Sequence, residues 1–197
     1  DFQQTALELA AEQQTPAWLA ALRQQGASTW AAAAWPGRKT EHWKYISLAP
    51  LQQCEQLGWS SESDDVALDA VEQIELDAIR LVFVNGRFNA ARSSALPAGV
   101  VRFADANTEQ QALIQQHLGK VVDSERHMFA ALSNAWAADG VLLHVARGHK
   151  LEKPVYIVNV STAQANPVAA SQRVLVVLED NAEAELIEHY ASDSVSQ

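Results

Sequence analysis

Four short β-prone segments follow Gly140, and no helical segment lies between them. They cover residues 141–145, 155–160, 172–178 and 184–190, and short connections containing Gly, Pro, Asn and Asp separate them. Strands in such a series, without crossover helices, are typical of an antiparallel sandwich or of the stacked rungs of a β-solenoid. The apolar runs are nearly continuous, as in strands that lie between other strands. No fixed-period repeat decides between the two folds, so both stay open on periodicity alone.

The segment before residue 36 is rich in Ala, Gln and Leu, which favours helix. We expect one helix with an apolar stripe at Leu7, Ala10 and Ala11. A second helix is expected from the Thr15-Pro16 pair to Gly26, and a third from Ser28 to Trp35, ended by Pro36-Gly37. The N-terminal part of the chain is therefore predicted to be mainly helical.

The middle of the chain contains a hairpin between polar and helical segments. Residues 52–79 are polar and acidic, which predicts an exposed loop or linker. Residues 80–88 contain an Asn85-Gly86 pair between two β-prone runs, the strongest short signal for a β-hairpin. Two more helices are expected, from Thr108 to Leu118 and from Ser124 to Ala138.

Charge and cysteine content exclude several classes of function. The chain has 14 Lys and Arg residues against 24 Asp and Glu, a net charge of −10, which argues against binding to nucleic acid or to an anionic membrane. The single cysteine, Cys54, rules out an internal disulfide and a multi-thiolate metal site. Apolar runs are too short to span a bilayer and no secretory signal is visible, so we expect a cytoplasmic protein.

No residue stands out as catalytic or metal-binding. Cys54 has no basic neighbour that would activate a thiolate, so we expect a structural role. His144 and His149 are expected at strand edges or turns. A largely acidic group near the end of the chain is expected on a solvated face; it comprises Glu179, Asp180, Glu183, Glu185, Glu188 and His189. The chain lacks the nucleotide-binding, hydrolase and zinc-protease motifs, and we predict that it is not an enzyme.

The segment PGRKTEHWKYISLAPL, residues 36–51, contains more charged and aromatic residues than a simple connection needs. Basic, acidic and aromatic side chains are crowded within eight positions: Arg38, Lys39, Glu41, Trp43, Lys44 and Tyr45. Glu41 can pair with Arg38 or Lys44, and a cation can lie over an aromatic ring. The functional interpretation is a docking surface for a partner. The structural one, favoured by the aromatic content, is a packing anchor between the helical region and the β region.

Four stretches of this chain together resemble the SufD family of iron–sulfur cluster assembly proteins. They are residues 36–51, RLVFVNGRF at 80–88, GVLLHVARGHKLEKPVYIVNV at 140–160, and RVLVVLEDNAEAELIEHY at 173–190. Within the first, Arg38, Lys39, Glu41, Trp43, Lys44 and Tyr45 match the family's R-K-x-E-x-W-K-Y signature.

The resemblance implies an α+β fold: an N-terminal helical region over 1–139 with a hairpin near 80–88, then the first rungs of a right-handed parallel β-helix over 140–197. It also implies a non-catalytic scaffold subunit of a SufBCD-type complex, with a SufB-like subunit and a SufC-like ATPase as partners and most contacts beyond residue 197. An iron–sulfur cluster is implied for the full complex, with no cofactor bound by this segment. Two alternatives remain: a β-helix enzyme acting on carbohydrate, and a structural solenoid adaptor unrelated to iron–sulfur biology.

Overall fold

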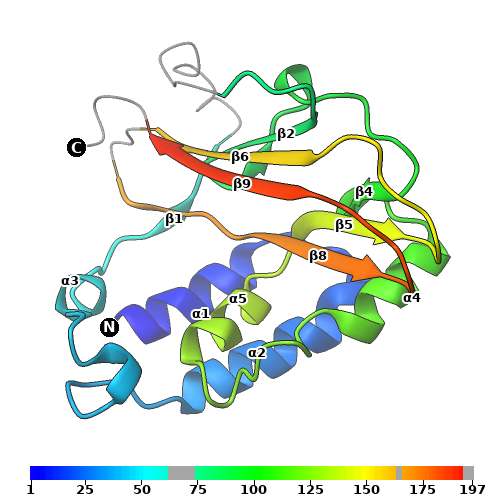
Figure 1. The fold of residues 1–197 in the computed structure, drawn as a ribbon. Helices are drawn as coiled ribbons and strands as arrows, with labels where there is room; N and C mark the ends of the chain where they lie inside the picture. Colours follow the sequence, from blue (N-terminus) through cyan, green and yellow to red (C-terminus); the bar gives the residue numbers. More distant parts are fainter. Residues whose placement is uncertain (62–73, 163–165, 193–197) are drawn as a thin grey trace.

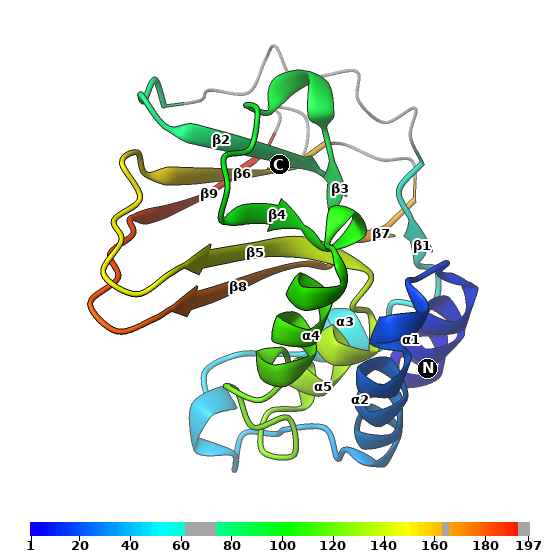
Figure 2. The ribbon, with the colours of Figure 1, turned by 90° about the vertical axis from the view of Figure 1, so that its right-hand side faces the viewer.

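A computed structural model describes residues 1–61, 74–162 and 166–192 of the chain. The elements form three layers, with helices on one side, a sheet of order β4-β5-β8 in the middle, and a sheet of order β3-β2-β6-β9 on the other side (Figure 1). The second view, turned by 90°, shows the same order of layers (Figure 2). The fold is therefore a mixture of helix and sheet with the first helices at the N-terminus.

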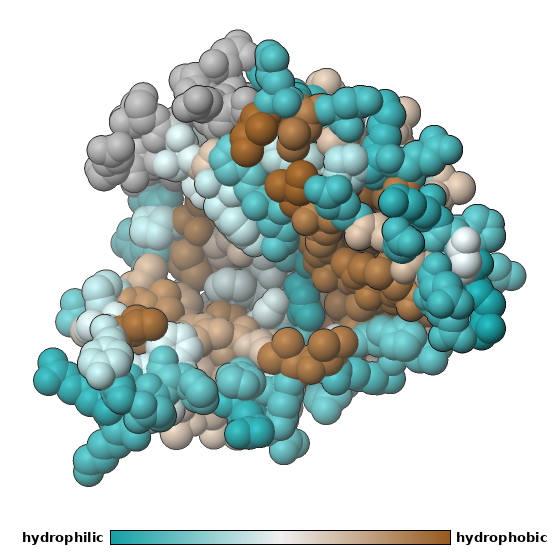
Figure 3. All heavy atoms as spheres, viewed as in Figure 1, coloured by the Kyte–Doolittle hydropathy of each residue, from teal (hydrophilic) through white to brown (hydrophobic). Residues whose placement is uncertain are grey.

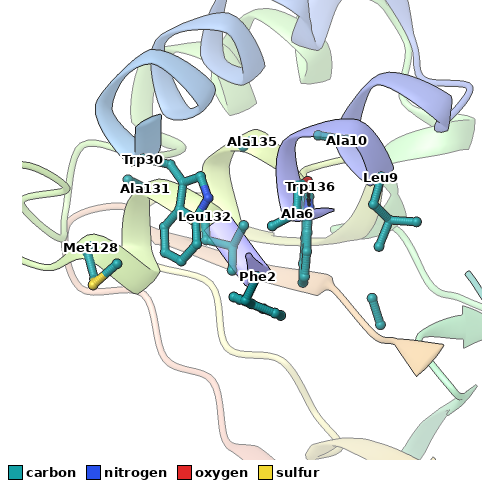
Figure 4. Close-up of a cluster of buried hydrophobic side chains, with 11 residues drawn as sticks. Phe2, Ala6, Leu9, Ala10, Trp30, Met128, Ala131, Leu132, Ala135 and Trp136 are labelled. Carbon is teal, nitrogen blue, oxygen red and sulfur yellow. Dashed lines mark hydrogen bonds between the residues drawn. The ribbon is translucent and has the colours of Figure 1, made fainter. Parts of the chain in front are cut away.

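The helical layer is built around α1 (Phe2–Glu12), α2 (Ala20–Ala32) and α5 (Met128–Ala135). Their shared core includes the rings of Phe2, Trp30 and Trp136 (Figure 4). Three tryptophan indoles fix α1 in place, because each donates its N–H to a carbonyl of that helix. The donors are Trp30 to Gln3 at 3.0 Å, Trp136 to Ala6 at 2.9 Å and Trp59 to Leu9 at 3.0 Å.

The predicted helix end at Gly26 is wrong. After a short 3-10 turn, η1 (Ala17–Leu19), helix α2 runs through Gly26 and Ser28 to Ala32. A Cβ atom at Gly26 would lie 2.5 Å from the backbone nitrogen of Ala135 and 2.8 Å from the carbonyl oxygen of Ala131. The glycine is needed for close contact between two helices, not for a stop.

Of the two helices predicted after the hairpin, the first has nearly the predicted bounds and the second is shorter than predicted. Helix α4 (Thr108–His117) matches its prediction within one residue, and Asn107 and Gln110 form a reciprocal capping box at its start. Helix α5 is shorter than predicted, because residues 124–127 and 136–138 lie outside it. The carboxylate of Asp123 instead accepts hydrogen bonds from the backbone N–H groups of Glu125 and Arg126, forming a turn before the helix.

The four strands expected after Gly140 are present, as β5 (Asp139–Val145), β6 (Val155–Ser161), β8 (Gln172–Leu178) and β9 (Leu186–Ser192). Strand β5 pairs with β8, and β6 pairs with both β9 and β2 (Ile79–Val84), all in parallel. Asp139 pairs with Gln172 and Lys150 with Glu183, each across 33 residues. The antiparallel sandwich is therefore excluded, since the chain passes between two sheets and returns in parallel beside its earlier strand.

Shorter strands complete the sheets. The predicted hairpin is confirmed: β2 pairs in antiparallel fashion with β3 (Arg87–Phe88), and Asn85 and Gly86 have φ of 47° and 81°. Strand β4 (Val100–Arg102) lies antiparallel to β5, and β1 (Gly58–Trp59) pairs with β7 (Val168–Ala169). Strand β1 lies in the segment predicted as an exposed loop, so that prediction fails there. Residues 62–73 of the segment lie outside the described part.

Two apolar layers hold the sheets in place. Between the sheets, Leu81 and Ile157 of one face Val141 and Leu143 of the other, all buried. On the opposite face of β5 and β8, Leu142 and Leu175 pack against Leu19, Phe103 and Ile114 of the helical side. Strands β2 and β4, which precede residue 139, thus share sheets with later strands. The division of the chain at residue 139 stays a prediction.

In the described part of the chain, further short helices lie in the connections: η2 (Glu41–Trp43), α3 (Ala49–Gln52), η5 (Ala90–Arg92) and η6 (Phe103–Asp105). Among the described residues, no helix has both the length and the apolar character needed to cross a bilayer.

Candidate docking surface

Residues 36–51 form a loop at the end of the helical layer, which we call the motif loop. It follows the C-terminal end of α2 and contains η2 and the first three residues of α3, at the lower left of Figure 1. Arg38, Lys39, Glu41 and Tyr45 are exposed, while Trp43 and Lys44 are half-buried. The structure therefore brings the six signature residues together on one surface loop.

An aromatic cluster anchors the motif loop to the helices. The ring of Trp43 lies 5.2 Å from that of Phe129 at the start of α5, and the ring of Trp35 lies 6.1 Å from the same phenylalanine. Trp30 of α2 lies 5.8 Å from Phe129 and closes the cluster. Aromatic contacts of this kind add to the free energy gained by burying the rings. Trp43 therefore packs against a ring of helix α5.

The charged residues of the motif loop interact locally. Lys44 Nζ lies 2.5 Å from Glu41 Oε1, so the carboxylate pairs with one of its two expected partners. The same ammonium group lies 5.0 Å from the centre of the Tyr45 ring. Tyr45 is otherwise 90% exposed. A tyrosine so exposed contributes little to the fold, which leaves its ring available to another molecule.

Cys54 lies just after α3 in a structural setting. Its side chain is half-buried against the core of the helical layer, and its Sγ lies 3.4 Å from the carbonyl oxygen of Gln56. In the part of the chain that the structure describes, no group of three or more His, Cys, Asp or Glu side chains is arranged to hold a metal ion.

The acidic residues after β8 face basic residues at the end of β5 and in the connection that follows it. His144 Nε2 lies 2.9 Å from Glu179 Oε1, Arg147 lies 2.6 Å from Asp180, and Lys150 lies 3.2 Å from Glu183. The hydrogen bond with His144, and a second one from the backbone N–H of Arg147, lower the pKa of the Glu179 carboxyl below its ordinary value. His149 hydrogen-bonds with the Arg147 carbonyl. These contacts join two successive connections.

A contact between Tyr156 of β6 and His189 of β9 is not predicted by the sequence. Tyr156 is fully buried, and its hydroxyl lies 2.7 Å from His189 Nδ1. The two rings are stacked with centroids 6.0 Å apart, and the backbone N–H of Ile74 donates to the same hydroxyl at 3.2 Å. His189, which the sequence placed on a solvated face, is therefore a partly buried partner of Tyr156. Only the parallel pairing of β6 with β9 brings the two together.

A cleft with a volume of about 970 Å³ lies between the C-terminal end of α1 and the β2–β3 turn. Its lining includes Trp59, Arg87, Arg102 and Asp139. Arg102 forms an ion pair with Asp139 and lies over the ring of Phe88, 4.3 Å from its centroid. This ion pair links β4 to β5, while Nε of Arg102 is buried without a hydrogen-bond partner among the described residues.

Exposed apolar side chains also lie on β8 and β9. Val176 and Leu178 share the face of β8 on which Val174 packs into the core between the sheets, yet they are 40% and 44% exposed. Tyr190, on the same face of β9 as the core residue Leu186, is 70% exposed. Hydrophobic residues are visible along these strands in Figure 3. Inward-facing positions are therefore open to solvent at this end of the stack.

Comparisons with known proteins identify relatives for most of the chain. Residues 2–157 match the family model described as the SufBD protein N-terminal region. The chain is 26% identical over 168 residues to an iron–sulfur cluster assembly SufBD family protein of Synechocystis, covering 82% of this chain and 36% of that protein. It is 30% identical over 159 residues to the iron–sulfur cluster assembly protein SufD of Escherichia coli, covering 80% and 36%. The chain thus spans little more than a third of the length of these relatives.

Proposed function

This chain belongs to the SufBD family of iron–sulfur cluster assembly proteins, and from that membership we propose that it serves as a non-catalytic scaffold subunit of a SufBCD-type complex. Its partners are a SufB-like subunit and a SufC-like ATPase, and its setting is the cytoplasm. The iron–sulfur cluster is the cargo of that complex. The observation that carries the proposal is the family match over residues 2–157, which includes the motif loop.

The parallel stacking of the strands supports a right-handed parallel β-helix as the finer fold. Strands β5 and β6 form one passage through the two sheets, and β8 and β9 form the next. Parallel connections within a sheet are almost always right-handed. The exposed inward positions Val176, Leu178 and Tyr190 are then the surface on which a further rung stacks.

The motif loop is the part of this chain that we assign to partner contact. Trp43 is held by Phe129, which fixes the loop on a rigid helix. Arg38, Lys39 and Tyr45 are exposed around that anchor. A single segment thus combines a packing anchor with side chains that point to solvent.

The carbohydrate-enzyme alternative fits the acidic residues poorly. A glycosidase needs one carboxyl group with a raised pKa to act as the general acid. The pKa of Glu179 is instead lowered, and the carboxylates of Asp180 and Glu183 contact basic side chains. The solenoid-adaptor alternative shares the fold with the scaffold proposal and differs from it only in biological role.

The scaffold proposal is tested by expressing the full-length gene with its genomic neighbours and purifying the tagged product. We expect an ATPase and a second SufBD-type subunit to co-purify, and deletion of the gene to lower aconitase activity under iron limitation. Recovery of the tagged protein alone, with aconitase activity unchanged in the deletion strain, contradicts the proposal.

A double variant distinguishes the scaffold proposal from the carbohydrate-enzyme alternative. Glu179→Gln with Glu183→Gln removes two carboxylates of the row after β8. We expect this variant to restore aconitase activity in the deletion strain as fully as the wild type does. A loss of complementation by a variant that still co-purifies with its partners supports catalysis instead.

A further inference from the structure

We propose that the motif loop and a second loop, residues 117–127, form one composite surface that binds an acidic segment of a partner protein carrying apolar side chains. The inference rests on the docking role proposed above for the motif loop, and it adds a second loop and the chemistry of the partner.

The two loops lie side by side at the end of the helical layer. The ring of His42 lies 6.3 Å from that of His127, and Trp43 contacts Phe129 two residues further on. Both ribbon views show the loops as neighbours on the side of the helices away from the sheets (Figures 1 and 2). A partner that binds the motif loop from solvent therefore also meets residues 117–127.

Large apolar side chains are exposed on both loops. Tyr45 is 90% exposed and Ile46 58% in the motif loop, while Val121 is 84% exposed and Val122 52% in the second. Four such side chains on two adjoining loops are more than scattered surface apolar residues, and exposed apolar groups with a polar rim mark interaction sites.

The composite surface has the opposite charge to the rest of the chain. Residues 36–51 and 117–127 contain five basic residues, Arg38, Lys39, Lys44, Lys120 and Arg126, and three acidic ones, Glu41, Asp123 and Glu125, a balance of +2. With a net charge of −10 for the whole chain, the remaining residues carry −12. A local positive potential on an acidic protein steers an acidic partner to this surface.

Two of the three acidic side chains of the surface are engaged in contacts, whereas four of the five basic ones are not. Glu41 pairs with Lys44, and Asp123 accepts hydrogen bonds from backbone N–H groups of its own turn. Within the described residues, the side chains of Arg38, Lys39, Lys120 and Arg126 form no ion pair or hydrogen bond. Four exposed cations therefore remain available to carboxylates from outside.

A protein segment fits this surface better than a lipid membrane. An anionic bilayer presents an extended negative plane. This plane would repel the rest of the chain, whose net charge is −12. A peptide segment reaches the two loops alone and places carboxylates and apolar side chains alternately. Lipid binding is therefore the outcome that the experiment must exclude.

The test measures the affinity of the chain for a fluorescent synthetic peptide in which Glu alternates with Leu, by fluorescence anisotropy at low and high salt. We expect the affinity to fall as salt is raised, and a peptide alternating Lys with Leu to bind at least about tenfold more weakly. Three double variants test the surface: Arg38→Glu with Lys39→Glu, Tyr45→Ser with Ile46→Ser, and Lys120→Glu with Arg126→Glu. Each is expected to weaken binding of the acidic peptide about tenfold or more.

Matched controls lie outside the surface. Arg147→Glu reverses an exposed cation elsewhere, and Tyr190→Ser removes another exposed tyrosine. Both are expected to leave the affinity within about twofold. The first charge-reversal variant should bind the Lys–Leu peptide more tightly than the wild type does, a gain that misfolding cannot produce. Circular dichroism checks the fold of every variant.

Three results overturn the inference. One is equal affinity of the wild type for the two peptides. Another is that Lys120→Glu with Arg126→Glu leaves the affinity for the acidic peptide unchanged. The second loop would then not be part of the binding surface. The third is binding to phosphatidylglycerol vesicles without binding to the acidic peptide. None of these results bears on co-purification with an ATPase, so the scaffold proposal is tested separately.

Discussion

Glu179 shows how one surface carboxylate depends on a contact across the stack. Its pKa is lowered by the hydrogen bond with His144 and by the backbone N–H of Arg147. A group with a lowered pKa in the folded state contributes its stability above its ordinary value of about 4.5, and loses that contribution as the pH falls through the folded-state pKa.

We therefore predict that Glu179→Gln lowers the urea midpoint of unfolding near pH 6, and that the difference from the wild type shrinks as the pH falls to about 3. The measurement is a series of urea titrations across this range. Glu152→Gln is the control, because Glu152 is exposed and makes no hydrogen bond or ion pair within the described residues. A difference between wild type and Glu179→Gln that stays constant with pH contradicts the prediction.

Two aromatic residues of the motif loop, two positions apart, are expected to behave in opposite ways. Trp43 packs on Phe129, whereas Tyr45 is 90% exposed. Trp43→Ala should lower the free energy of unfolding by about 1–3 kcal/mol, less than a fully buried tryptophan because the ring is half-exposed. Tyr45→Ala should change it by less than about 0.5 kcal/mol. Equal losses in urea denaturation would show that both rings serve packing.

At the scale of elements, the contact between α2 and α5 depends on the absence of a side chain at Gly26. A Cβ there meets backbone atoms, which cannot move aside as a flexible side chain does. Overpacking costs about 1–3 kcal/mol, while Ala gains about 1 kcal/mol over Gly in a helix.

Gly26→Ala is therefore predicted to destabilise the fold by up to about 2 kcal/mol net in urea denaturation. Gly37→Ala is the matched control, since no atom lies within 4 Å of its Cβ position, and its effect should stay within about 0.5 kcal/mol. A stabilised Gly26→Ala would mean that α2 and α5 separate without loss of packing.

The sequence predicts those elements whose signals are local. The Asn85-Gly86 turn and the apolar runs of β5, β6, β8 and β9 each lie within a few adjacent residues. Strands β1 and β7 have two residues each and form only because they pair with one another, so no local pattern indicates them. Glycine is also the residue that commonly ends a helix, so position 26 gives no local signal that α2 continues. Its role in the close contact with α5 is visible only in the tertiary structure.

Part of the candidate docking surface is recognisable from the sequence, and part is recognisable only from the structure. The six signature residues from Arg38 to Tyr45 were recognisable because they are contiguous. Phe129, which anchors them, and the exposed pair Val121 and Val122 lie in segments without a motif. Their relevance follows from the tertiary arrangement that places residues 117–127 beside the motif loop.

For the molecule as a whole, the solvent-exposed apolar face of β8 and β9 predicts association. Within the described residues, each of these strands has a single neighbour, so one edge of each presents free backbone groups beside Val176 and Leu178. We expect the average mass of the 197-residue chain to rise with concentration in sedimentation equilibrium. Val176→Lys with Leu178→Lys should reduce that rise, and Tyr45→Ser with Ile46→Ser should leave it unchanged. A strictly monomeric wild type contradicts this.

The 33-residue register between β5 and β8 restricts how homologous chains can differ in length. A single residue inserted within β8 would turn its inward side chains outward, because neighbouring residues of a strand face opposite sides. Insertions and deletions compatible with the fold therefore belong in the connections after the strands, or they comprise a whole repeat of two strands with their connections. Evolutionary change in the size of this region is expected to be stepwise, with each step close to the spacing of Lys150 and Glu183.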